Sequence, residues 1–465
     1  MVRKVHLTLG TALGEEGHDY SDHKNHVSKA AFRQIMSIAG ALERDVFPFA
    51  EIFDITVLDA DSATLSASLV NNKTSQLRLN WRCVPALSIS YMLKRIQAGS
   101  RTNKINCLDI SFRNDDEAVP KILSLLGDTL NRMHALETLH LPSFITCDQN
   151  IWENIRQLPY LRNLHESSIV ERPRLESYLT PVASIGEGFP TLAKFRCALP
   201  HATASRLFSP SIPKYQLQEI HILVYDLSDA IETYTLLTEI ARAAPNLRDF
   251  GMDFTESEHA LKIEIFTPIL QLTNISSLIL RTDLANKLTD EKFQMIVDAV
   301  PRLQVLSITP STVTAESTRP LATLKALNFI ARRCASIRSL CIHLDASNAR
   351  LPSYFTRLEQ LPHTLSQLNF GLSVCEDPLR TALQLMRMLR YSYPRVHSHK
   401  ASEFLHRVKA NESKKYADAA QRWLEVASCV RQLRPFVDSV VESLVQSSDG
   451  SDVSGSEKDL MLELP

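Results

Sequence analysis

Four residues with imidazole or guanidinium side chains recur at intervals of 25 to 31 residues: His140, His165, Arg196 and His221. Lys194 stands two residues before Arg196. Side by side, these groups could dock an acidic or phosphorylated segment of a partner, because arginine holds carboxylate or phosphate with two hydrogen bonds and histidine adds pH sensitivity. Three histidines could instead ligate zinc. A third interpretation is a solvated polar face on which the rings stack.

The zinc interpretation lacks a feature that metal sites usually have. In this row no carboxylate stands beside the histidines to orient them as a second shell of ligands. Another cluster, His18, His23 and His26 with Asp19 and Asp22, matches no structural zinc spacing, which favours an exposed polar loop. We therefore expect no metal site.

Catalytic motifs are also absent from the sequence. No serine stands in Gly-x-Ser-x-Gly, and no His-Glu-x-x-His occurs. Only 12 glycines occur in 465 residues, and their spacing fits no phosphate-cradling loop or dinucleotide turn. We expect a protein that is not an enzyme and that uses no cofactor.

A repeated frame explains the spacing of the basic residues. Apolar residues fill its first, fourth and sixth positions, as in Leu136, Leu139 and Leu141. The mean step between frames is about 29 residues, with single steps of about 24 to about 34, as in leucine-rich repeats. So short a unit cannot bury its apolar face alone and must stack on its neighbours. The sixth position falls at Ile55, Leu79, Ile110, Leu141, Glu166, Cys197, Ile222, Met252, Leu280, Ile308, Ile342 and Phe370.

The segments between the frames have helical spacing. Apolar residues recur at i, i+3, i+4 and i+7 in 293–300, and similar patterns run through 236–241 and 321–331. A proline, which cannot continue a helix, stands two residues before the frame at Pro159, Pro190, Pro245 and Pro301. Alternating strands and helices predict parallel strands with right-handed crossovers. We therefore expect an α/β leucine-rich-repeat horseshoe, with a parallel sheet on the concave face and helices outside.

The frame also shows which residues share a face. Side chains alternate across a strand, so the first, fourth and sixth positions point into the core and the third and fifth onto the concave face. Neighbouring strands lie ~4.8 Å apart, so residues at the fifth position of successive frames should adjoin. We expect the partner-binding residues to be His140, His165, Lys194, Arg196 and His221. Further along, Asp249, Asp253, Ile279 and Val305 make the face acidic and then neutral.

The solenoid is expected to occupy residues 1–410, with about 12 to 14 units. Residues 411–446 read as a helical cap over the last repeat, with one apolar stripe that includes Trp423, Leu424, Ala427 and Val430. A helix that binds a partner is the alternative for this segment. Residues 447–465 are acidic and serine-rich, which predicts a disordered tail.

Composition bounds the environment. The net charge is −1, so no global basic field attracts nucleic acid. No apolar run approaches the ~20 residues of a membrane span. Eight cysteines without a Cys-x-x-Cys pair indicate free thiols in a reducing compartment, either cytoplasm or nucleus.

With the repeats placed, the chain resembles the leucine-rich-repeat region of fungal-type F-box proteins. The resemblance rests on the opening Val2-Arg-Lys-Val5-His-Leu7, on Ala-Pro245-Asn-Leu247-Arg-Asp-Phe250 and on Gln421-Arg-Trp423-Leu424. It implies a substrate-recruiting subunit of an SCF-type ubiquitin ligase, in which an N-terminal F-box grips the adaptor of the cullin. Here the repeats begin at residue 2, so the F-box itself is absent. The asparagine expected after the frame is replaced by Phe144, Ser311 and Asp283.

Two functions remain open at this point. The first is a non-catalytic protein–protein recognition scaffold that recruits substrates to a ubiquitin ligase, with an adaptor bound only if an F-box is supplied upstream. The second is a free-standing leucine-rich-repeat scaffold or inhibitor without a ligase. In both, the partner is a protein, with an acidic or phosphorylated segment as one candidate for what it docks, and neither nucleic acid nor a membrane is expected to be involved.

Overall fold

A computed structural model describes most of the repeat region. The described residues are 4–9, 34, 49–57, 69–70, 73–81, 86–98, 104–112, 119–142, 148–166, 189, 191–209, 216–225, 229–254, 262–310, 319–347, 360–370, 373–389, 395–397, 421–435 and 439. The polar segment 11–30 with its histidine cluster, the tail 447–465, Pro190, Phe144 and Ser311 lie outside them.

The chain divides into two compact units. Unit 1 comprises Met1–Leu284 and Asp298–Thr312, and unit 2 comprises Ala285–Val297 and Val313–Pro465. The strands of unit 1 are β1 (Lys4–Leu9), β2 (Ile52–Val57), β3 (Gln76–Trp81), β4 (Cys107–Phe112), β5 (Thr138–Leu141), β6 (Asn163–Glu166), β7 (Lys194–Pro200), β8 (Glu219–Tyr225), β9 (Asp249–Phe254), β10 (Ser277–Arg281) and β11 (Val305–Thr309). Each pairs in parallel with the next in chain order, as a leucine-rich-repeat solenoid requires.

The register of the sheet follows the apolar frame. Ile55 pairs with Leu79 and Leu79 with Ile110, while Cys197, Ile222 and Met252 are partners further along. These sixth positions are buried, as the frame predicts. Glu166 fills the same position of β6, where its carboxylate accepts a hydrogen bond of 2.9 Å from the backbone N–H of Ala198. The predicted register is therefore confirmed, including the frame that a carboxylate closes.

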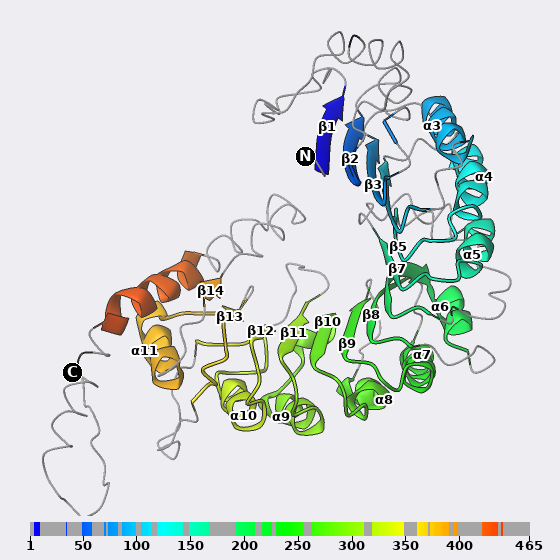
Figure 1. Ribbon diagram of the computed structural model, residues 1–465. Coiled ribbons are helices and arrows are strands. Elements are labelled where there is room, and N and C mark those ends of the chain that lie inside the picture. The colour runs from blue at the N-terminus through cyan, green and yellow to red at the C-terminus, as the bar shows by residue number, and fades with distance from the viewer. Residues whose placement is uncertain are drawn as a thin grey trace, which may run out of the picture. The chain divides into compact units, whose positions relative to one another are not determined.

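Helices connect the strands and lie along one side of the unit 1 sheet (Figure 1). We call the other side the open face. Aspartate side chains start two of the helices: Asp148 accepts a hydrogen bond from the N–H of Ile151, and Asp229 from that of Glu232. The helices of the chain are α3 (Ala86–Ala98), α4 (Val119–Leu130), α5 (Gln149–Arg156), α6 (His201–Leu207), α7 (Ala230–Ala243), α8 (Thr267–Leu270), α9 (Asp290–Ala299), α10 (Lys325–Arg333) and α11 (Pro378–Met388), with short 3₁₀ turns at Ile263–Phe266 and Asp283–Asn286.

Most of the predicted helix boundaries agree with the structure. Helices α5, α7 and α9 end two or three residues before Pro159, Pro245 and Pro301, as proline at those places predicts. The segment 321–331 is an exception. Helix α10 begins only at Lys325, and Leu321 precedes it with 58% of its surface exposed, so including Leu321 in the apolar stripe was wrong.

The core under the open face is built from aromatic and aliphatic side chains. Trp152 of α5 is 1% exposed and packs against Phe195 of β7, with ring centroids 6.4 Å apart. Phe195 meets Phe208 edge to face at 6.0 Å. Because Phe195 is packed in the core, these contacts hold β7 in place. The outward residues Lys194 and Arg196 of the same strand are therefore well positioned.

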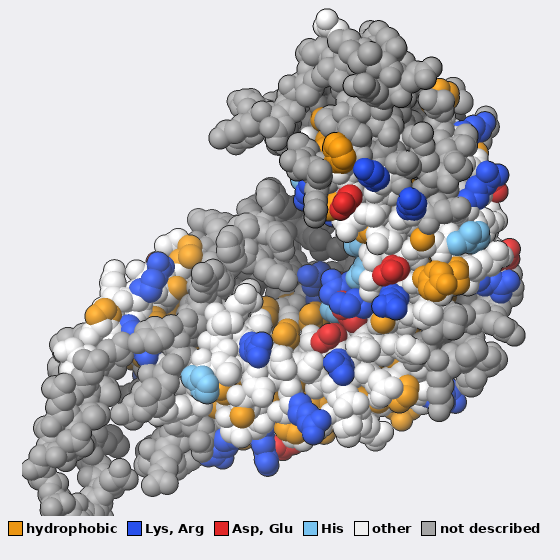
Figure 2. Space-filling view, viewed as in Figure 1, with side chains coloured by type: hydrophobic (Ala, Val, Ile, Leu, Met, Phe, Trp, Pro, Cys, Tyr) orange, Lys and Arg blue, Asp and Glu red, His pale blue; other side chains and the backbone are white. Residues whose placement is uncertain are grey.

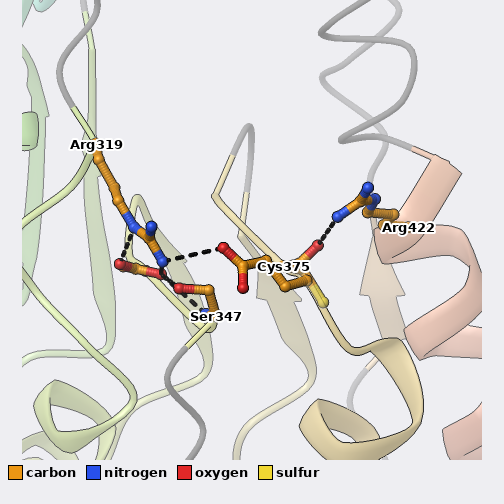
Figure 3. A network of polar contacts seen from close by, with 6 residues as sticks. Arg319, Ser347, Cys375 and Arg422 are labelled. Carbon is orange, nitrogen blue, oxygen red and sulfur yellow. Dashed lines mark hydrogen bonds and ion pairs between the residues drawn. The ribbon is translucent and has the colours of Figure 1, made fainter.

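Unit 2 continues the same architecture with β12 (Ser339–Ile342), β13 (Gln367–Asn369) and β14 (Arg395–His397), in which β13 pairs in parallel with both neighbours. Residues 421–435 form a helix beside the last repeats. Its Trp423 stacks on Phe370 at 4.3 Å and donates a hydrogen bond of 2.8 Å to the carbonyl of Ser373. Arg422 donates to the carbonyl of Cys375 at 3.0 Å (Figure 3).

A second set of polar contacts stabilises the loops of unit 2. Arg319 forms an ion pair with Asp345 and lies 3.4 Å from Glu376 (Figure 3). The carboxylate of Asp290, at the start of α9, accepts hydrogen bonds of 2.8 Å from both the backbone and the hydroxyl of Thr323. In these contacts the charged groups of unit 2 bind other residues of the same unit, so their role is to stabilise its loops.

Candidate functional site on the open face of unit 1

The four basic residues predicted to adjoin occupy adjacent strands. His140 of β5 pairs in register with His165 of β6, His165 with Arg196 of β7, and Arg196 with His221 of β8. We call these four the imidazole–arginine row. Lys194 lies two residues before Arg196 on the same face of β7. The fifth site residue predicted from the sequence therefore borders the row.

Glu219 lies among these cations and was missed by the sequence reasoning. Its carboxylate is 2.6 Å from Nε of Arg196, 3.0 Å from Nζ of Lys194 and 4.0 Å from Nε2 of His221. The imidazole–arginine row itself contains no carboxylate, as the sequence indicates, but Glu219 stands next to that row. Glu219 occupies the third position of β8, opposite Lys194 in the register. Reading the third positions as a second row would have found it.

Glu219 is held in its ionised form. Only 9% of its side chain is exposed, while Lys194 and Arg196 are half-exposed. Burial acts to raise the pKa of Glu219, but the hydrogen bond from Lys194 and the charge of Arg196 outweigh it, and the net pKa lies below the ordinary value. One carboxylate thus fixes two cations, and both are already paired before any partner arrives.

His140 and His165 form a neutral stacked pair. Their ring centroids are 4.8 Å apart with an interplanar angle of 21°. Burial lowers the pKa of His165 to about 4, with His140 and Arg196 contributing in the same direction. The pKa of His140 is also lowered, mainly by burial. At neutral pH these rings are uncharged, and they offer stacking surface and hydrogen bonds instead of positive charge.

His221 lies over a glycine on the next strand. The fifth position of β9 is Gly251, and a Cβ atom built there would fall 2.3 Å from Nδ1 of His221. The imidazole therefore occupies the space that a side chain at residue 251 would need. Burial and the charge of Arg196 lower the pKa of His221 to about 4, in spite of Glu219. His221 is also neutral at pH 7.

Charges elsewhere on the open face are paired in the same way. Arg78 lies 2.7 Å from Asp109 and 3.4 Å from Asp54, on the strands on either side of it, and His6 of β1 lies 3.0 Å from Asp54. Arg281 of β10 lies 3.3 Å from Asp253 of β9. Figure 2 accordingly shows acidic, basic and imidazole side chains intermixed on this face. The described part of the face therefore mixes charges of both signs, several of them in ion pairs.

A pocket of about 310 Å³ opens beside the imidazole–arginine row. Glu166, Arg196, His221 and Asp253 contribute polar groups, while Leu223, Gly251 and Ile279 contribute apolar surface. All of them come from β6 to β10 of unit 1. Its volume is at the lower end of the range for sites that bind small molecules or single side chains.

The described residues offer little for metal chemistry. Among them, no three histidine, cysteine, aspartate or glutamate side chains gather closely enough to hold a metal ion. Within the same part of the chain, no helix has the length and apolar character needed to cross a membrane. The chemistry that the described site supports is recognition by hydrogen bonds, stacking and apolar contact.

Comparison with solved structures adds a distant likeness. No protein-family model matches the sequence, and no curated protein matches it either. Among solved structures, the chain is similar to the crystal structure of the Rad7 and Elc1 complex in yeast, with 15% identity over 62% of this chain and 75% of that chain. The TM-score is 0.32, too low to establish a common fold, so the solenoid is assigned on its strand order and register.

Proposed function

We propose that this chain is a non-catalytic protein–protein recognition scaffold whose partner docks on the open face of unit 1. The supporting observation is the arrangement around Glu219, which holds Lys194 and Arg196 in place beside the stacked rings of His140 and His165. Side chains that are already ordered lose less entropy when a partner binds, so the face is preorganised for recognition.

Site-specific photo-crosslinking tests this proposal. Two variants are made, each with one photoreactive amino acid. In the first it replaces Ser307, on the open-face side of β11, and in the second it replaces Ile231, which is 76% exposed on α7. We expect a protein to be crosslinked in cells from residue 307 and not from residue 231. Crosslinks from residue 231 alone would place the partner on the helical side and contradict the proposal.

For the finer function, we propose a substrate-recruiting leucine-rich-repeat subunit of an SCF-type ubiquitin ligase, on the strength of the sequence resemblance. An adaptor of the cullin is a partner only where an F-box precedes the repeats. The alternative is a free-standing scaffold or inhibitor without a ligase, and in both cases we place the protein in the cytoplasm or nucleus. Co-purification of the full-length native protein with a cullin-ligase adaptor separates the two, since its absence from the complex favours the free-standing scaffold.

An acidic or phosphorylated partner segment is a further proposal for the row itself. Such a segment would have to share Lys194 and Arg196 with Glu219, so charge attraction alone would be weak. If this segment is the partner, the Kd of its complex with the protein should rise with salt, and Lys194→Gln should weaken binding while leaving the Arg196–Glu219 pair intact. A Kd independent of both changes would exclude it.

A further inference from the structure

The pocket beside Arg196 owes its shape to one missing side chain. Gly251 stands in the fifth-position row between His221 and Ile279, and each of those neighbours carries a side chain on the open face. The His221 ring leans into the space next to Gly251. Beyond the ring, the surface of Leu223 and Ile279 is left partly exposed, which makes an apolar floor. A partly exposed apolar floor in a recess favours an apolar occupant.

Three charged side chains line the pocket, Glu166, Arg196 and Asp253, and each is engaged by a neighbouring group. Glu166 accepts a hydrogen bond of 2.9 Å from the backbone N–H of Ala198. Arg196 is paired with Glu219 through Nε at 2.6 Å, and Asp253 with Arg281 at 3.3 Å. His221 is neutral near pH 7, because its pKa is lowered to about 4. A charged occupant would lose hydration and would have to share a charged wall group that already has a partner, which weakens its attraction. The electrostatics of the pocket therefore favour an uncharged occupant.

Arg196 adds a preference among uncharged groups. Its guanidinium is half-exposed and is held edge-on by Glu219 through Nε. A planar guanidinium in a fixed position stacks well on an aromatic ring. An aliphatic side chain cannot form this cation–π contact. The neutral imidazole of His221 supplies a second flat surface on the pocket wall.

We propose that this pocket receives an uncharged aromatic side chain of the partner protein, with the ring on the apolar floor of Leu223 and Ile279 and against the guanidinium of Arg196. The inference rests on the proposed function, because it takes the occupant from a protein docked on the open face. It departs from the acidic docking patch expected from the sequence, since the cations of that patch are engaged by Glu219.

Disulfide tethering measures the preference of the pocket without a known partner. A cysteine at Ser307 lies next to Ile279 in the register and leaves every pocket residue intact. The full-length Ser307→Cys protein is equilibrated with an equimolar mixture of four disulfides on the same two-carbon linker, ending in phenol, isobutyl, carboxylate or ammonium groups. Peptide mass spectrometry then measures how much of each group is attached at residue 307 and distinguishes it from label on the native cysteines. Gln76→Cys, on the open face of β3 outside the pocket, is the matched control.

We expect the phenol at residue 307 to exceed both the carboxylate and the isobutyl group by about two- to tenfold, the range for one aromatic contact. At residue 76 the four groups should be captured about equally. Leu223→Asn or Gly251→Ala in the Ser307→Cys protein should remove the preference, with circular dichroism confirming the fold. A carboxylate preference, equal capture of isobutyl and phenol, or no preference at residue 307 would overturn the proposal. Because no partner is used, these outcomes are independent of the photo-crosslinking result.

Discussion

The carboxylate of Glu219 lies 2.6 Å from Nε of Arg196 on the neighbouring strand, with 9% of the glutamate side chain and 50% of the arginine side chain exposed. The glutamate is thus the buried centre of a cluster whose cations reach the surface. Such a cluster should stabilise the fold and lower the positive charge of the open face. Its contribution to the free energy of unfolding can be measured.

Replacing this carboxylate should cost stability and make the face basic. Glu219→Gln leaves Lys194 and Arg196 without their shared counter-charge, so we expect a loss of about 1 kcal/mol, limited by the exposure of both cations. Urea unfolding at pH 7 measures the loss. Lys194→Gln is the control and should cost less than about 0.5 kcal/mol, because the Arg196 pair remains. Equal losses for the two variants would show that Glu219 is not the centre of the cluster.

The buried imidazoles should make the protein sensitive to acid. The pKa values of His165 and His221 are about 4 in the folded protein and about 6.5 in the unfolded chain. Above pH 6.5 both states are neutral and stability does not depend on these groups. Between pH 6.5 and 4 the unfolded chain binds protons that the folded protein does not. The free energy of unfolding should therefore fall as the pH is lowered through this range.

Urea unfolding at pH 7 and at pH 5 measures this fall. His165→Phe keeps a ring beside His140 but cannot bind a proton, so its stability should fall less than that of the unsubstituted protein over the same range. An identical pH dependence in the variant would mean that His165 is not responsible. Lys94→Gln, an exposed change on α3, controls for the general effect of substitution.

A side chain at residue 251 should compete with the His221 ring for the same space. Gly251→Ala places a Cβ atom 2.3 Å from the imidazole Nδ1, so the ring must move or the strand must shift, at a cost of about 1–3 kcal/mol. In a His221→Ala background the same change should cost much less. The coupling energy from this double-mutant cycle in urea is the measurement. Additive losses would show that the two residues do not compete for this space.

Trp423 should hold the C-terminal helix of unit 2 in place. Its indole is 2% exposed, stacks on Phe370 and donates a hydrogen bond to Ser373, so Trp423→Ala should cost about 3–5 kcal/mol. Cys375, also buried, should then react faster with a thiol reagent under native conditions, as mass spectrometry can follow. Leu424→Ala changes a residue that is 48% exposed and should leave the labelling rate unchanged.

The fold could be predicted further than the site. Residues such as Leu139 and Ile222 recur in an apolar frame that can be read directly along the chain, so the sequence predicts the strands, their parallel order and their register. Helix starts were less certain. Leu321 fits the helical spacing, yet the backbone becomes helical only at Lys325, because helix boundaries depend on tertiary contacts such as the hydrogen bonds from Thr323 to Asp290.

By itself the sequence determined that His140, His165, Arg196 and His221 share one face on four adjacent strands, because each occupies the fifth position of its apolar frame. Only the tertiary structure decided what these residues are. Burial keeps the three imidazoles neutral, and Glu219 pairs with both cations from the neighbouring strand. Burial and pairing depend on distances between side chains of different repeats. A periodic pattern along one chain records which positions meet, but it does not record the protonation and the pairing that follow when they do.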